Sequence, residues 1–148
     1  MDIRDMMLIE SAPAVFLSTV NSGGFPNTRA MLNLRNKLQF PSLVTFFEPY
    51  KETLALFFTT NSFSKKIREL KENPNASAYF CSPENWHGVM LQGRLEIVRD
   101  SVVRHRIWQN DWDIYYKGGV DSDDYVVLRF DPLNISSYYQ FQRFESKI

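Results

Sequence analysis

Residues 56–74 have the sequence LFFTTNSFSKKIRELKENP, in which an aromatic and β-branched run passes through a hydroxyl-rich turn into a charged, amphipathic segment. The run Leu54–Thr60 favours a strand. The segment Ser64–Asn73 favours a helix, because apolar residues recur in it at helical spacing and a proline follows it. One face of this helix is expected to carry the apolar side chains of Phe63, Ile67 and Leu70.

The start of this helix has the chemistry of an anion site. The first turn of a helix offers unpaired backbone N–H groups and the positive end of the helix dipole. Ser62 and Ser64 add hydroxyl donors, and Lys65 and Lys66 add positive charge. The pattern predicts a phosphate site, suited to a mononucleotide. Taken alone, serines that cap a helix and lysines that solvate its surface explain the same residues.

The rest of the chain is rich in short strands. Asn21-Ser22-Gly23-Gly24 predicts a tight hairpin turn, Gly93 a bulge, and Asp131-Pro132 a turn. Residues 36–53, with two prolines, favour either a strand near Leu43–Phe47 or a long loop. The other expected strands are Ala14–Val20, Pro26–Leu34, Ala76–Cys81, Val89–Val98, Tyr125–Phe130 and Ile135–Phe141, and the other expected helices are Ile3–Glu10 and Asp100 to about Trp112.

These elements indicate a mainly β protein. About seven short strands with few helices between them favour an antiparallel barrel or sandwich over a parallel sheet. A length of 148 residues, 44% of them hydrophobic, is suited to one domain over residues 1–148. No dinucleotide or P-loop glycine motif occurs.

Composition also restricts the partners. Seventeen basic residues balance seventeen acidic ones, so no overall field attracts nucleic acid or an anionic membrane. No apolar run approaches the ~20 residues that span a bilayer, and the one cysteine, Cys81, agrees with a reducing compartment. We therefore expect a cytoplasmic protein that binds neither nucleic acid nor membrane.

Other chemistries find little support in the sequence. His87, His105 and Cys81 lack the spacing of a metal site, so no metal is expected. No Gly-x-Ser-x-Gly elbow points to a hydrolase, and no side chain stands out as a general acid or base. Trp86, Trp108 and Trp112 favour core or dimer-interface positions over base stacking.

Several separated motifs occur in an order that resembles one known family. The motifs are Ser22–Met31 with its turn, proline and arginine, Phe57–Lys66 followed by Asn73-Pro74, Gln92–Val98, Trp108–Tyr116, and Gly118–Arg129. Over about residues 8 to 140 the chain resembles the pyridoxamine 5′-phosphate oxidase-like split-barrel flavoproteins, in particular their general stress protein 26-like branch. This resemblance implies an antiparallel, Greek-key FMN-binding split barrel with a few flanking helices.

The resemblance also implies a cofactor and its site. The cofactor would be FMN, bound between the two subunits of a homodimer. Arg29, Ala30 and Met31 would lie beside the isoalloxazine ring and Thr60 near the ring or the ribityl chain. Ser64, Lys65 and Lys66 would hold the phosphate, and Gly88 to Gln92 would approach the flavin from the partner subunit.

The implied function is an FMN-dependent oxidoreductase that acts on an unidentified small molecule or electron donor. The chain ends soon after Arg143, without the arginine-rich segment of the full-length oxidases, so vitamin B6 oxidase activity is not expected. One alternative is a non-catalytic flavin-binding sensor or stress-related module. Another is a haem or deazaflavin binder, for which His87 would be the candidate haem ligand. The catalytic residues stay unknown.

Overall fold

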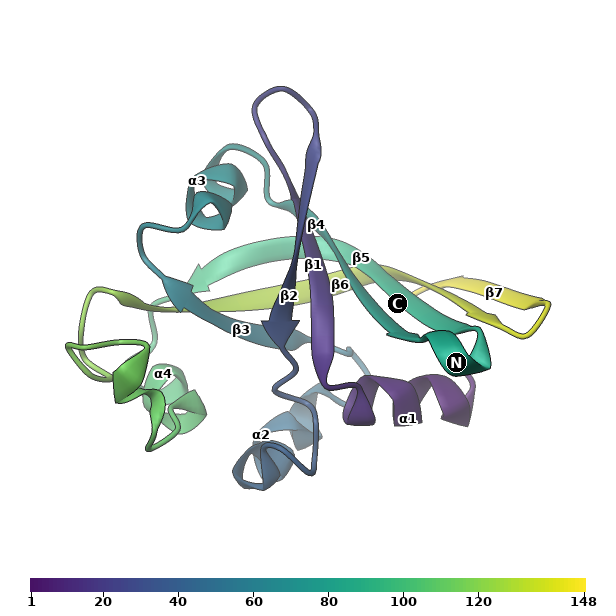
Figure 1. The fold of residues 1–148 in the computed structure, drawn as a ribbon, viewed down its shortest axis with the longest axis horizontal. Coiled ribbons are helices and arrows are strands. Elements are labelled where there is room, and N and C mark those ends of the chain that lie inside the picture. Colours follow the sequence, from purple (N-terminus) through teal and green to yellow (C-terminus); the bar gives the residue numbers. More distant parts are fainter.

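The computed structural model describes all 148 residues and contains one seven-stranded antiparallel sheet, shown in Figure 1. Its strands, in chain order, are β1 (Ala14–Val20), β2 (Pro26–Leu32), β3 (Leu56–Asn61), β4 (Asn75–Ser82), β5 (His87–Val98), β6 (Tyr125–Tyr139) and β7 (Gln142–Lys147). Their neighbour order is β2-β1-β4-β5-β6-β3, and β7 pairs with β6. The helices are α1 (Ile3–Ser11), α2 (Val44–Phe47), α3 (Lys65–Glu72) and α4 (Ser101–Ile107).

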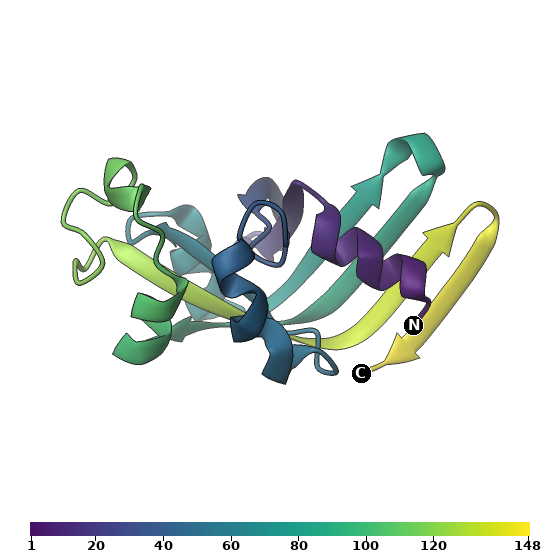
Figure 2. The same cartoon turned by 90° about the horizontal axis from the view of Figure 1, so that it is seen from below.

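The sheet curls so that its two outer strands, β2 and β3, approach each other without forming a ladder. The helices α1 and α3 pack against the concave side, and Figure 2 shows α1 lying across β4 and β5. The prediction of an antiparallel split barrel with a few flanking helices is confirmed. None of the helices is long and apolar enough to cross a bilayer.

Side chains alternate along β3 and β6 between two apolar cores. Phe58 and Leu128 belong to the larger core inside the barrel, which contains 20 buried residues. Phe57 and Val127 point the other way, into a second core of 11 buried residues. Because both faces of these strands are covered, β3 reads as a continuous apolar run rather than an alternating one.

Residues 36–53 cover the second core, and of the two alternatives predicted for them the strand near Leu43–Phe47 is wrong. The segment forms α2 between two short 3-10 turns, Pro41–Leu43 and Glu48–Tyr50. Leu43 and Phe47 are four residues apart, so a helix places both on the buried side. The ring of Phe47 packs edge-on against Phe57 with 6.0 Å between centroids.

The predicted turn at Asp131-Pro132 is also wrong, because β6 runs unbroken past it. The predicted bulge explains how: the β5–β6 register shifts between Gln92 and Gly93, and Gly93 lies opposite Pro132. A β-carbon on Gly93 would lie 2.1 Å from the carbonyl oxygen of Asp131. Only glycine permits this approach, so the proline is accommodated within the ladder.

The chain end and two helices differ from expectation as well. The turn lies at Gln140 and Phe141, both at positive φ, and leads into β7, which was not predicted. Helix α4 ends at Ile107, and Trp112 begins a separate 3-10 turn. Phe63 precedes α3 and is 80% exposed, not part of its buried face. The buried face of α3 consists of Lys66, Ile67, Glu69 and Leu70.

Candidate functional site

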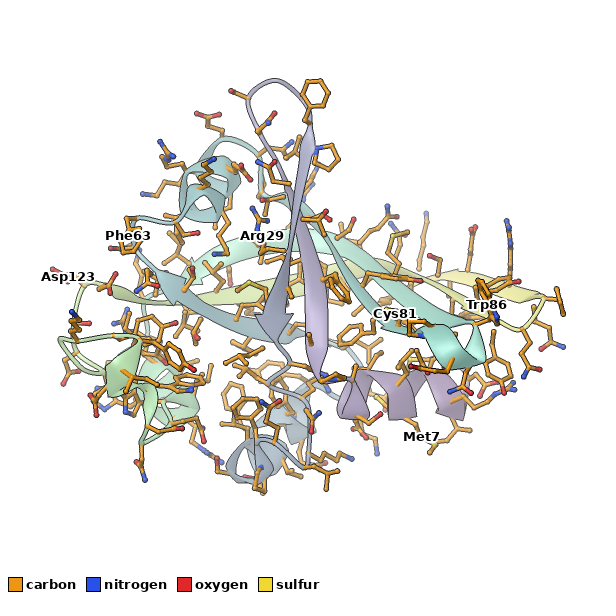
Figure 3. All side chains as sticks on the ribbon, in the orientation of Figure 1. Met7, Arg29, Phe63, Cys81, Trp86 and Asp123 are labelled. Carbon is orange, nitrogen blue, oxygen red and sulfur yellow. The ribbon has the colours of Figure 1, made fainter.

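A polar cluster forms where α3 packs on the concave face of β1 and β2. Thr19 and Asn27 are cross-strand partners, and Arg29 lies opposite Leu17, so all three side chains share that face. Figure 3 shows Arg29 in the middle of the molecule, on the side of β2 toward α3. Arg29 Nη1 donates to Thr19 Oγ1 at 2.7 Å. The cluster therefore joins the first hairpin to the helix.

Glu69 of α3 is the acceptor at the centre of this cluster. Its carboxylate accepts hydrogen bonds from the hydroxyl of Thr19 and from Asn27 Nδ2, the latter at 2.5 Å. Arg29 Nη2 lies 3.7 Å from Glu69 Oε2. Burial acts to raise the pKa of Glu69, but these hydrogen bonds and the Arg29 charge lower it more, so the net shift is downward. The carboxylate is held in its charged form.

Lys66 lies on the same buried face of α3, one turn earlier. Its Nζ donates to Thr60 Oγ1 and to Ser64 Oγ, both at 2.7 Å. No carboxylate oxygen lies within 4.0 Å of it, which is the distance that defines an ion pair. Burial, and then the charge of Arg29, lower the pKa of Lys66, while Glu69 opposes the shift. The structure thus holds a desolvated cation that lacks a direct counter-charge.

Donors remain free at this point. An ammonium has three N–H donors, and two of those of Lys66 are used by Thr60 and Ser64. The Ser64 side chain does not cap α3, and the backbone N–H groups of Lys65 and Lys66 have no hydrogen-bond partner within the protein. The start of α3 therefore presents several unpaired donors, which is the kind of arrangement that an anion accepts from.

Ser62 contributes differently from the sequence expectation. Its N–H and hydroxyl both donate to the Asp124 carboxylate, at 3.2 and 3.4 Å. Asn61 Nδ2 donates to the same carboxylate at 2.8 Å. The acidic loop before β6 therefore fixes the turn in front of α3. Ser62 uses its donors in these hydrogen bonds and does not add one to the start of the helix.

The predicted site residues lie at different places on the sheet and on α3. Arg29, Thr60, Ser64 and Lys66 converge beside α3, whereas the Lys65 side chain is exposed. Met31 shares the concave face with Arg29 and packs on the larger core. The remaining three, Ala30, Gly88 and Gln92, lie on the convex side of the sheet.

The sequence analysis missed Glu69 and Thr19. Glu69 stands three residues after Lys66, which places both on one face of a helix. That spacing was the available signal, but it is also the ordinary spacing of solvent-exposed charges. Thr19 gave no signal, because a threonine in a strand is favoured by β propensity alone.

The chain matches one family model and is similar to several solved structures. The family model for pyridoxamine 5′-phosphate oxidase matches residues 4–139, and no curated protein matches the chain. A Clostridium acetobutylicum structure, described as a protein related to general stress protein 26 of Bacillus subtilis in the pyridoxinephosphate oxidase family, is 27% identical with a TM-score of 0.78. The comparison covers 99% of this chain and 93% of that one.

Two further structures share the fold at lower identity. General stress protein 26 from Bacillus anthracis is 20% identical with a TM-score of 0.65, covering 94% of this chain and 95% of that one. A haem-binding protein from Mycobacterium smegmatis is 15% identical with a TM-score of 0.65, covering 95% of this chain and 55% of that one. The family match over most of the chain, on a split barrel, shows that this protein belongs to the pyridoxamine 5′-phosphate oxidase family, in its general stress protein 26-like branch.

Proposed function

We propose that the protein is an FMN-binding oxidoreductase whose phosphate site is the start of α3. The observation that carries this proposal is the buried Lys66 ammonium, which has a free N–H beside two free backbone N–H groups. A phosphate dianion supplies the counter-charge that Lys66 lacks, and it accepts several hydrogen bonds at once. The donor set therefore fits the phosphate of FMN.

FMN supplies two-electron transfer when it is bound, and the protein supplies binding and orientation. Ser64 and Lys66 bind the phosphate, and Thr60 holds the Lys66 ammonium in place. Arg29 stands on the strand expected beside the ring, and Thr19 and Glu69 hold its guanidinium on the concave face. Arg29 would thus present a fixed positive charge.

The haem alternative finds little support at His87. Its Nε2 shares a hydrogen bond of 2.8 Å with Asp5 Oδ1, between α1 and the sheet, where both side chains are buried. The ring also packs edge-on against Tyr139. His87 therefore fastens α1 to the barrel and is not directed toward the Arg29 and Lys66 cluster. Deazaflavin binding and a cytoplasmic location stay predictions.

A homodimer through the convex sheet face is part of the same proposal. Ala30, Phe16, Tyr79 and Met90 are successive cross-strand partners from β2 to β5, so they form one row on that face. Phe16 is 39% and Tyr79 42% exposed. Gln92, which the family resemblance assigns to the partner's flavin, lies on the same face. A second subunit seated on this row would bring Gln92 toward the cofactor.

Introducing a charge into this row is expected to weaken both the dimer and FMN binding. Phe16→Glu places a carboxylate at the centre of the row, and we expect the dimer dissociation constant to rise at least tenfold, about 1.4 kcal/mol. Sedimentation velocity across protein concentrations measures the dimer, and FMN titration measures the cofactor. Val102→Glu, at a 74% exposed apolar position on α4 and not on the sheet face, is the control. A monomeric wild-type protein that still binds FMN would refute the interface.

The first test of the cofactor is an absorption spectrum. Purified protein, incubated with FMN and freed of excess by gel filtration, is expected to retain about one FMN per chain. Anaerobic addition of NADH or NADPH then distinguishes an oxidoreductase from a non-catalytic flavin-binding module, because bleaching of the flavin band shows electron transfer. Retained flavin that no donor reduces would favour the non-catalytic module. Failure to retain FMN would refute the proposed function.

A further inference from the structure

A second cation, Arg35, is buried beneath residues 36–53, and its side chain contacts only neutral groups. Arg35 is 5% exposed. Its Nε donates to the carbonyl oxygen of Ala55 at 3.1 Å, and its Nη2 donates to those of Tyr50 and Ala55, both at 2.9 Å. The guanidinium lies over the Phe47 ring, 4.6 Å from its centroid. Arg35 thus fastens the end of the segment to the strand that follows.

No carboxylate within ion-pair distance balances this charge. Glu10, the acidic group that acts on Arg35, is already paired with Lys37 at 2.6 Å. Burial lowers the pKa of Arg35 to about 10, against the opposing effect of Glu10. A buried charge without a counter-ion is unfavourable unless a partner is supplied. The structure therefore carries an unbalanced guanidinium at this place.

The free end of Arg35 opens into a cavity. Nη1 makes no hydrogen bond within the protein, yet no enclosed side-chain nitrogen lacks a partner, so Nη1 must be accessible. Arg35 lines a cavity of about 50 Å³ at this point. Its walls include charged and aromatic side chains, namely those of Glu10, Lys37, Phe40, Phe47, Glu48 and Lys51.

We propose that this cavity binds the carboxylate of a small monoanionic acid. Three cationic and two anionic side chains line it, which leaves one net positive charge. The two N–H groups of Nη1 suit a carboxylate, and charge-assisted bonds of this kind are the stronger ones. Phe40 and Phe47 provide apolar wall for a methyl group. Since one water needs roughly 10–15 Å³, the volume limits the ligand to a few heavy atoms.

The proposed site is separate from the cofactor cluster, because no residue is shared between them. A bound carboxylate would link Arg35, at the start of residues 36–53, to Lys51 near their end. Binding would hold this segment on the second core. A ligand at this site would therefore stabilise the folded segment. The proposal does not depend on whether the protein binds FMN.

Acetate is the probe for the test. Thermal unfolding is followed while acetate replaces chloride at constant ionic strength. Saturable binding to the folded state is expected to raise Tm by about 3–6 °C at ten times the dissociation constant. Lys51→Met is expected to weaken acetate binding at least fivefold, whereas Lys71→Met, an exposed lysine on α3, leaves it unchanged.

Arg35→Met is expected to abolish the acetate response, with circular dichroism to verify its fold. If this variant does not fold, the comparison of acetate binding by Lys51→Met with that by Lys71→Met tests the site instead. Isothermal titration of acetate into the wild-type protein provides a second, independent measurement of binding. The proposal is overturned if replacing chloride by acetate at constant ionic strength leaves Tm unchanged. It is equally overturned if isothermal titration of acetate shows no saturable heat, or if the Tm of Lys51→Met responds to acetate like that of the wild type.

Discussion

Replacing Lys66 by methionine is expected to raise the dissociation constant of FMN about 10- to 100-fold. Hydrogen bonds that involve a charged group contribute about 1.5–3 kcal/mol each, and each 1.4 kcal/mol is a factor of ten in affinity. The substitution removes the Lys66 ammonium but keeps the backbone N–H groups at the start of α3. Titration of FMN against its fluorescence quenching measures the change.

The stability of the apoprotein serves as the internal control. Methionine has a similar length and is not penalised by burial, whereas the Lys66 charge is desolvated and has no direct counter-ion. We expect the free energy of unfolding to change by less than about 1 kcal/mol. Lys65 is the exposed neighbour of Lys66, and Lys65→Met is expected to weaken FMN binding less than Lys66→Met does. Equal losses in the two variants would contradict the assignment of the phosphate to Lys66.

Replacing Glu69 by leucine is expected to lower the free energy of unfolding by about 2–4 kcal/mol. The change leaves Thr19 and Asn27 without their shared acceptor and Arg29 without the nearby carboxylate. An unpaired buried donor costs about 1–3 kcal/mol, and of the three side chains Thr19 is the one that is fully buried. Urea denaturation of the apoprotein measures the effect. Glu72→Leu, on the exposed side of the same helix, is the control and is expected to stay within about 0.5 kcal/mol of wild type.

The acid dependence of stability provides a second reading for Glu69. Its pKa is lowered in the folded protein, so the unfolded chain binds the proton more readily. The resulting stability is present above the ordinary glutamate pKa of about 4.3 and is lost as the pH falls through the folded value. The difference between wild type and Glu69→Gln should therefore narrow below about pH 4. A constant difference from pH 7 to pH 3 would show that the Glu69 charge contributes nothing.

Local pattern was enough to predict most of the sheet and part of the site. Strand periodicity and turn residues located β1, β2, β4 and β5 nearly to the residue, and Gly93 marked the bulge that the register confirms. Residue type and spacing also brought forward Lys66 and Ser64, because a hydroxyl and lysines at a helix start are a local signal.

Residues 36–53 and the end of β6 could not be predicted from local pattern. A short apolar run such as Leu43–Phe47 is compatible with a helix and with a strand. Packing against Phe57 in the second core decides between the two. Likewise, Pro132 ends a strand unless the partner strand bulges at that position, and that partner lies about forty residues away in the chain.

By itself, the sequence determined a mainly β, antiparallel fold and the hydrogen-bond donors at the start of α3, because these follow from periodicity and from the residues of a single turn. Periodicity left a barrel and a sandwich open, and it was the resemblance to a known family that favoured the split barrel. Tertiary structure alone decided which lysine is buried, that Glu69 holds Arg29, and that Arg35 faces a cavity. The physical reason is that burial and charge pairing depend on contacts between segments far apart in the chain. The type of a residue limits which groups it can bind, and the packing of the folded chain determines which of those groups it contacts.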